Sequence, residues 1–137
     1  MIVVTGTGIV SAIGTNTSEV ARALLADTNG IAPVRFLETQ HRQMPVGEVK
    51  LSNEQLAQRL GVPCTANTSR TMLLGTLALR EALAMAGINS EQLADVALVS
   101  GTTVADMDCV ERHFNAAQSN NALGDCGRST QEMVQNV

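Results

Sequence analysis

Short apolar runs along the chain predict two β-strands. Ile2–Thr5 is a β-rich run that ends at Gly6, and Val96–Ser100 is a continuous apolar run that ends at Gly101. A short apolar run bounded by glycine is typical of a strand that is buried on both faces. A weaker strand is expected within Val46–Lys50, where apolar and polar residues alternate.

Apolar residues at helical spacing predict three helices. The first is capped by one of residues 16–18 and ends before Gly30. The second is capped by Thr68 or Ser69 and extends through residues 70–86, with a glycine stop at position 87. Its middle is apolar almost all round, so we expect other elements to cover it on more than one side. The third is expected over residues 104–116.

The order of these elements predicts an α/β fold with a mixed, mainly parallel sheet between helices. Strands alternate with helices, and such connections are right-handed crossovers. Two clear strands are few for a parallel sheet, which is normally flanked and covered on both faces. Ser129 and Glu132 have the spacing of a capping box, and only eight residues follow Ser129. We therefore expect residues 1–137 to be one N-terminal segment of a larger domain that is incomplete at its C-terminal end.

Composition narrows the possible partners and compartments. The chain has 137 residues, two phenylalanines as its only aromatic residues, and a net charge of −4. Nucleic-acid binding needs stacking rings and a surplus of basic residues, so neither nucleic acid nor a membrane surface is an expected partner. The chain has no run of ~20 apolar residues, no charged leader and no CxxC among its three cysteines. We therefore expect a cytoplasmic protein.

Two glycines near the N-terminus invite comparison with the dinucleotide-binding fingerprint. Gly6 and Gly8 follow the first predicted strand, and a glycine turn before a helix can hold a pyrophosphate. The match is incomplete, because Ser11 stands where the third glycine is required and helix signals begin only near Asn16. A purely structural turn is the favoured interpretation.

The cysteines are candidate nucleophiles, which need a helix N-terminus or a basic neighbour to favour the thiolate. Cys64 lies in a predicted loop and Cys109 within a predicted helix. Cys126 lies three residues before the helix cap at Ser129 and is the best placed of the three, but its neighbour Asp125 disfavours the thiolate. Incidental thiols are the favoured interpretation.

One pair of residues has the spacing of metal ligands. Cys109 and His113 are four residues apart on one predicted helix, with Asp106 within a turn of them. Because no second such pair exists, we interpret His113 as a surface histidine and predict no metal site. His41, next to Arg42, is expected in an exposed loop.

Several blocks taken together resemble the N-terminal part of a β-ketoacyl synthase that acts on acyl carrier protein, a condensing enzyme of the thiolase-like fold. The resemblance covers nearly the whole chain in the right order, and the opening block is its most specific part. The blocks are Val3–Gly14, Gly30–Ile31, Ser69–Arg70, Ala86–Ile88, Val99–Thr103 and Ser129–Thr130.

The resemblance implies a fold and a reaction. In that family two similar halves, each a five-stranded mixed sheet between helices, form a subunit, and subunits pair as dimers. A cysteine at a helix N-terminus takes an acyl group from a carrier protein. Two histidines then assist decarboxylation of malonyl-carrier protein and Claisen condensation, and no cofactor is needed.

The resemblance assigns no catalytic residue to this chain. It places the catalytic cysteine after the helix that begins at Ser129–Thr130, beyond Val137, and both histidines further on. One functional position carries over, because the family's turn matching Gly101–Thr103 approaches the acyl pocket near the dimer interface. Thr102 is therefore the predicted pocket-lining residue and Thr103 its substrate-binding neighbour, although Ala105–Asp106 stand where many relatives have glycines.

Three functions remain open from the sequence. The first is the N-terminal portion of an acyltransferase, inactive by itself, that condenses acyl and malonyl thioesters in fatty acid or polyketide-like synthesis. The second is a non-catalytic partner of the chain-length-factor type, which acts by dimerising with a ketosynthase-like subunit. The third is an independent small α/β binding protein.

Overall fold

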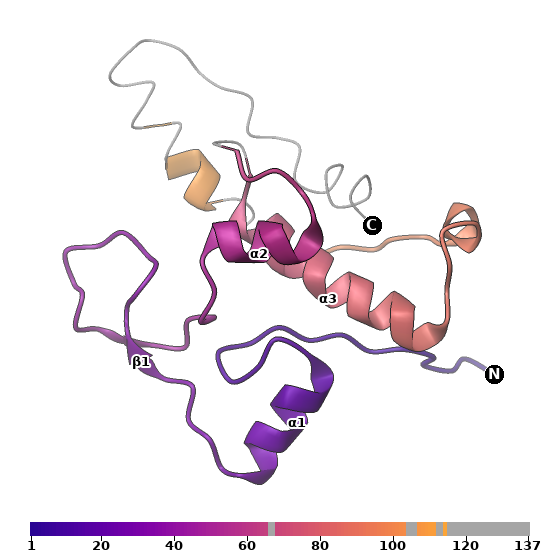
Figure 1. Ribbon diagram of the computed structural model, residues 1–137, viewed down its shortest axis with the longest axis horizontal. Coiled ribbons are helices and arrows are strands. Elements are labelled where there is room, and N and C mark those ends of the chain that lie inside the picture. The colour runs from indigo at the N-terminus through magenta and orange to yellow at the C-terminus, as the bar shows by residue number, and fades with distance from the viewer. Residues whose placement is uncertain (66–67, 104–106, 112–113, 115–137) are drawn as a thin grey trace.

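The computed structural model describes residues 1–65, 68–103, 107–111 and 114, and the structural statements below concern these residues (Figure 1). Residues 107–111 are helical. The named elements are, in order, α1 (Thr17–Leu25), β1 (Ala32–Pro33), β2 (Pro45–Val46), α2 (Asn53–Leu60), α3 (Arg70–Ala86) and the 3-10 helix η1 (Gln92–Asp95).

The longest described helix, α3, forms where the sequence predicts it. The Ser69 hydroxyl accepts a hydrogen bond from the backbone N–H of Met72 at 3.0 Å and caps its start. Gly87 ends the helix with a φ of 70°, a left-handed conformation that suits glycine. In Figure 1, α2 lies across the first half of α3, and the N-terminal segment passes along its second half. Two segments therefore cover α3, but only Met72, Leu73 and Thr76 are buried and Met85 is 54% exposed, so the expected cover is observed in part.

The buried core lies between α2 and α3. Its members are apolar side chains from one face of each helix: Leu56, Ala57, Leu60, Met72 and Leu73. Helix α2 is not among the helices predicted from the sequence, although local signals for it exist. The Ser52 hydroxyl and the Gln55 side chain form a reciprocal capping box, and Gly61 ends the helix in the left-handed conformation. With eight residues and few apolar positions, α2 is stable because it packs on α3.

The first predicted helix is also confirmed, as α1. The Asn16 side chain accepts a hydrogen bond from the backbone N–H of Glu19 at 2.8 Å, so Asn16 is the N-cap among the three candidates. Before it, Ser11 and Gly14 form an isolated antiparallel bridge that closes a tight loop. The loop is therefore fixed at the entry to α1.

The strands predicted at Ile2–Thr5 and Val96–Ser100 are not observed among the described residues. Both segments are extended, but neither belongs to a strand or bridge, and Ile2 is 101% and Val99 94% exposed. A strand exists only when its N–H and C=O groups pair with a neighbouring strand, and among the described residues no strand lies beside these segments. The predicted burial on both faces is therefore also absent.

The sheet that the structure does contain is small and antiparallel. Strand β1 pairs with β2 in the register Ala32 to Val46 and Pro33 to Pro45. The strand expected over Val46–Lys50 is confirmed only at its first residue. A mainly parallel sheet is thus not observed among the described residues.

The last predicted helix is confirmed in part. Residues 107–111 and 114 are helical, and the remainder of 104–116 lies outside the described residues. The predicted helix start at Ser129–Thr130 also lies outside them.

Candidate functional site

The turn Gly101–Thr103, predicted to line an acyl pocket, lies at the surface. All three residues are exposed, and they follow the extended segment 96–100 and precede the helical residues 107–111. A Cβ built on Gly101 would have no heavy atom within 4 Å. The role of Thr102 and Thr103 in an acyl pocket stays a prediction.

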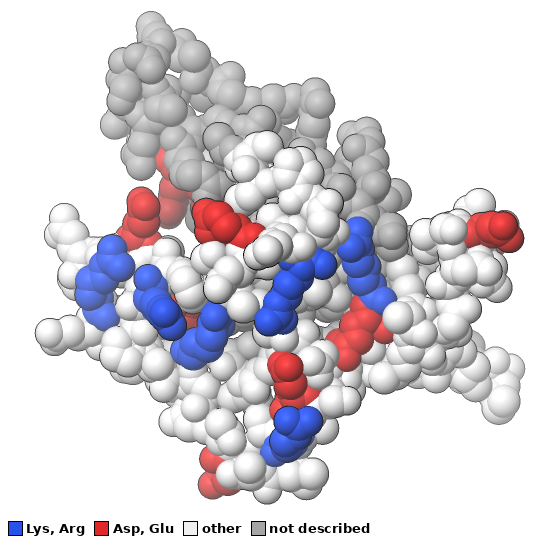
Figure 2. Space-filling view, in the orientation of Figure 1, with Lys and Arg blue, Asp and Glu red and all other residues white. Residues whose placement is uncertain are grey.

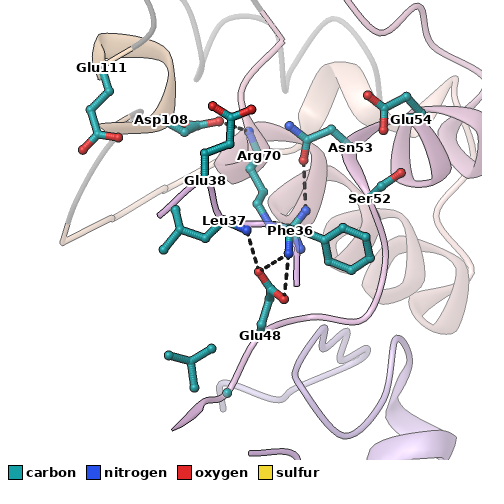
Figure 3. Close-up of a pocket in the computed structure, with 12 residues that line it drawn as sticks. Phe36, Leu37, Glu38, Glu48, Ser52, Asn53, Glu54, Arg70, Asp108 and Glu111 are labelled. Atoms are coloured by element: carbon teal, nitrogen blue, oxygen red, sulfur yellow. Dashed lines mark hydrogen bonds between the residues drawn. The ribbon is translucent and has the colours of Figure 1, made fainter. Parts of the chain in front are cut away.

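A surface hollow of about 640 Å³ lies elsewhere, at the N-terminal ends of α2 and α3 (Figure 3). Four stretches of chain meet around it: residues 36–38, 46–48, 52–54 and the helical residues 107–111, together with Arg70. Neither Thr102 nor Thr103 is among its lining residues. The hollow is therefore distinct from the predicted acyl-contacting turn.

The side chain of Arg70, the first residue of α3, links two of these stretches and also Val49, which follows a third. Its guanidinium donates to Asn53 Oδ1 and to the Val49 carbonyl, each at 2.9 Å. The guanidinium also lies over the Phe36 ring, 5.8 Å from the ring centre, a favourable cation–π geometry. Burial lowers the pKa of Arg70, whereas the charges of Glu48 and Asp108 act in the opposite direction. Arg70 is thus a half-buried cation held in place by its partners.

The Glu48 carboxylate is bound by backbone N–H groups and lies near Arg70. Its carboxylate accepts hydrogen bonds from the consecutive N–H groups of Arg35, Phe36 and Leu37, the shortest bond to each lying between 2.9 and 3.0 Å. Successive N–H groups that converge on one point form an anion-binding nest. Burial would raise the pKa of Glu48, but the backbone hydrogen bonds and the charge of Arg70 together hold it below its ordinary value of 4.5. The nest is therefore occupied by the chain's own carboxylate.

Replacing Glu48 with glutamine is expected to lower the free energy of unfolding at pH 7 by about 1–2 kcal/mol, because the three N–H groups lose a charged acceptor. A lowered pKa means that this stabilisation is present above pH 4.5 and is lost as the pH falls through the folded-state pKa. Urea unfolding at pH 7 and pH 3.5 measures the difference. We expect the gap between variant and parent to narrow at pH 3.5, and the exposed Glu38→Gln serves as the matched control. An equal gap at both pH values would contradict the prediction.

The N-terminal ends of α2 and α3 lie at the hollow. At each end, a side chain of the protein itself accepts a hydrogen bond from a free backbone N–H group. The Ser52 hydroxyl accepts from the Gln55 N–H at the start of α2, and Asp108 Oδ2 accepts from the Arg70 N–H at 3.0 Å at the start of α3. Negative charge at a helix N-terminus is stabilising. Asp108 thereby ties residues 107–111 to the start of α3.

The hollow is equipped for positioning rather than for bond chemistry. Its lining contains neither a thiol nor an imidazole, and the one hydroxyl, that of Ser52, is used as a helix cap. A nucleophile paired with a base, which covalent catalysis requires, is therefore absent from this lining. In the part of the chain that the structure describes, no three metal-ligating side chains are grouped.

The candidate cysteines and histidines are exposed, buried or outside the described residues. Cys64 and His41 lie in exposed loops, as expected. Cys109 is 2% exposed within the helical residues 107–111, which agrees with an incidental buried thiol. Cys126 lies outside the described residues. So do His113 and Asp106, which were considered together with Cys109 as metal ligands.

The glycines of the opening block have a packing role. A Cβ at Gly6 would collide with the Ala82 carbonyl, and a Cβ at Gly8 with the Ala78 carbonyl, both in the backbone of α3. The chain therefore passes directly against the helix, and only glycine permits this approach. The helix that follows, α1, begins at Thr17 rather than directly after the glycines. These observations support the structural interpretation over a nucleotide site.

The surface carries both signs of charge. In Figure 2, Lys and Arg side chains form a band across the face in view, with Asp and Glu side chains beside it. On this face, acidic side chains therefore lie close to the basic ones. None of the described helices is long and apolar enough to cross a membrane.

Comparison with protein families identifies the class of protein. The family model "Beta-ketoacyl synthase, N-terminal domain" matches residues 1–135, which is nearly the whole chain. The chain therefore belongs to the β-ketoacyl synthase family and corresponds to an N-terminal part of these condensing enzymes, with the thiolase-like α/β fold that the family implies. No match was found among curated proteins or among solved structures.

Proposed function

We propose that this chain is the N-terminal portion of a β-ketoacyl synthase that condenses an acyl thioester with malonyl-acyl carrier protein in fatty acid or polyketide-like synthesis. The observation that carries the proposal is the family match over residues 1–135. In this reaction the acyl group passes from the carrier thiol to an enzyme cysteine. Malonyl-carrier protein then loses CO₂, and the resulting enolate attacks the acyl carbonyl, which forms the new C–C bond and releases the cysteine thiolate.

The groups that perform this chemistry are proposed to lie outside these 137 residues. A helix N-terminus favours the thiolate and backbone N–H groups stabilise the oxyanion, but the resemblance places the cysteine and both histidines beyond Val137. Among the described residues, the hollow at α2 and α3 contains no nucleophile. We therefore propose that the chain by itself is inactive and serves as a scaffold that positions the acyl pocket.

The same proposal gives the two extended apolar segments a role. We propose that Ile2–Thr5 and Val96–Ser100 pair with other strands in a mixed, mainly parallel sheet of the complete domain. The support is that several of their large apolar side chains are exposed, including Ile2, Val4 and Val99. Removing such surface from water is favourable by roughly 25 cal/mol per Å².

The partners follow from the proposed reaction. We propose an acyl carrier protein with its acyl and malonyl thioesters, and a second ketosynthase-like subunit in a homodimer or heterodimer. The reaction needs neither cofactor nor metal. A cytoplasmic location and the absence of nucleic-acid and membrane partners complete the proposal.

The experiment combines an intact mass with an activity assay. The polypeptide is purified from the source cell, its mass is compared with 14.4 kDa, and it is incubated with acyl- and malonyl-carrier protein while 3-ketoacyl product is followed by mass spectrometry. A larger polypeptide that forms the product is the expected result. A polypeptide of 14.4 kDa without activity would overturn the proposal in favour of a non-catalytic partner of the chain-length-factor type.

Thr102 offers a specific prediction within this proposal. In the active polypeptide, Thr102→Phe is expected to lower kcat/KM for long acyl chains at least about tenfold relative to short ones, because a ring at the pocket wall removes volume. The matched control is Thr39→Phe in a separate loop. An unchanged ratio between long and short chains would show that Thr102 does not contact the acyl chain, and Thr103→Phe then tests its neighbour.

A further inference from the structure

A single carboxylate holds both ends of the loop that precedes α1. Glu81, on α3, accepts a hydrogen bond from the Ile9 N–H through Oε2 at 3.0 Å and one from the Thr17 N–H through Oε1 at 2.6 Å. Ile9 lies at the start of the loop and Thr17 is the first residue of α1. The two donors are far from Glu81 in sequence, so these bonds join the loop to α3.

The neighbouring contacts give Glu81 a defined position in this arrangement. Gly8 packs on Ala78 and Gly6 on Ala82, while the Thr7 N–H donates to Met85 Sδ at 3.3 Å. The N-terminal segment therefore lies antiparallel along α3. Of these contacts, the bond to the Ile9 N–H is the one in which α3 supplies a charged acceptor.

We propose that Glu81 is an acid-sensitive clasp that, when ionised, holds both Ile9 and Thr17 on α3 and releases them together when it is protonated. This inference goes beyond the proposed function, because it concerns how the chain holds its own N-terminal segment and does not depend on condensation. Its basis is that one group supplies the acceptors at both ends of one loop.

The electrostatics agree with a clasp that is closed at neutral pH. Burial would raise the pKa of Glu81, but the backbone hydrogen bonds from Thr17 and Ile9 outweigh it and hold this pKa below 4.5. The clasp is therefore closed above pH 4.5 and opens as the pH falls through the folded-state pKa.

Among the described residues, one charged group acts directly on Glu81, and a second lies behind it. The carboxylate of Glu19, on α1, acts against the charge of Glu81. Glu19 is itself held by the Thr15 N–H and hydroxyl, at 2.7 and 2.9 Å, and Arg59 of α2 donates to the same hydroxyl at 3.0 Å. Because these contacts keep the pKa of Glu19 low, both carboxylates titrate in the acid range.

Residue-resolved amide hydrogen exchange of the 137-residue chain tests the clasp. Glu81→Ala removes both acceptors and leaves a good helix former in α3. We expect exchange at Ile9 and Thr17 to accelerate at least about tenfold, the effect of losing a hydrogen bond to a charged group. The core amides of Leu56 and Leu73 serve as internal references and should keep their exchange rates. The matched control is Glu91→Ala, at a position whose side chain caps nothing.

Two outcomes of the exchange experiment on Glu81→Ala would overturn the proposal. One is unchanged exchange at either Ile9 or Thr17 in Glu81→Ala, and the other is an equal acceleration at Leu56 and Leu73, which would indicate global destabilisation.

A pH series on the parent chain gives a second measurement that needs no variant. Protection at Ile9 and Thr17 should fall together below pH 4.5, and in Glu81→Ala this dependence should be absent even though Glu19 still titrates. Parent protection that persists through the acid range would also overturn the clasp.

Discussion

Leu73→Ala is expected to lower the free energy of unfolding by about 2–5 kcal/mol. The Leu73 side chain is 0% exposed and lies in the middle of the cluster that joins α2 to α3. Truncation removes apolar contacts and leaves a cavity between two helices whose backbones cannot close on it completely. Urea unfolding followed by far-UV circular dichroism measures the loss.

The matched control for Leu73 is a leucine at the surface. Leu25, at the end of α1, is 91% exposed, so Leu25→Ala is expected to change the free energy of unfolding by less than about 0.5 kcal/mol. Similar losses for the two variants would contradict the position of the core between α2 and α3.

The second large effect is expected at Gly8. Gly8→Ala adds a methyl group where the Ala78 carbonyl of α3 already lies. The α3 backbone is held by its helical hydrogen bonds, so the segment at Gly8 has to move away from α3, which strains the Ile9–Glu81 hydrogen bond. Overpacking of this kind lowers stability by about 1–3 kcal/mol or more, and we expect the upper part of this range. Urea unfolding measures the loss, and amide exchange at Ile9, the next residue, reports any separation of the segment from α3.

Gly101→Ala is the control for this substitution, because a Cβ at Gly101 meets no heavy atom within 4 Å. It should unfold within about 0.5 kcal/mol of the parent chain. If Gly8→Ala matched the parent both in unfolding and in exchange at Ile9, the close approach of the N-terminal segment to α3 would be wrong.

Local signals account for the helices that the sequence predicted. Helix α3 has a serine cap, a long apolar stretch and a glycine stop, all within its own segment. Helix α1 likewise has Asn16 as its cap. Helix α2 was missed because it is short and offers only Leu56, Ala57 and Leu60 as apolar positions, which leaves its capping box and the glycine stop at Gly61 as its signals.

The hollow could not be predicted, because its contacts join residues that are distant in sequence. Arg70 reaches Asn53 and Val49, and Asp108 reaches back to the start of α3. Glu48 was predicted within a strand, whereas its side chain fills a nest formed by residues 35–37. Spacing along the chain carries no information about such pairs. For the same reason the sequence did not reveal Glu81 as the residue that joins the loop before α1 to α3.

The sequence by itself determined the family and the helices α1 and α3, because each depends on residues within one short segment or on motifs in a given order. Only the tertiary structure decided whether Ile2–Thr5 and Val96–Ser100 are strands, because a strand requires a partner. It also decided that Gly6 and Gly8 serve close packing against α3. Capping and helical periodicity act within a few residues. Strand pairing, close packing and the hydrogen bonds that Glu48 and Glu81 accept depend on which distant segments the fold brings together.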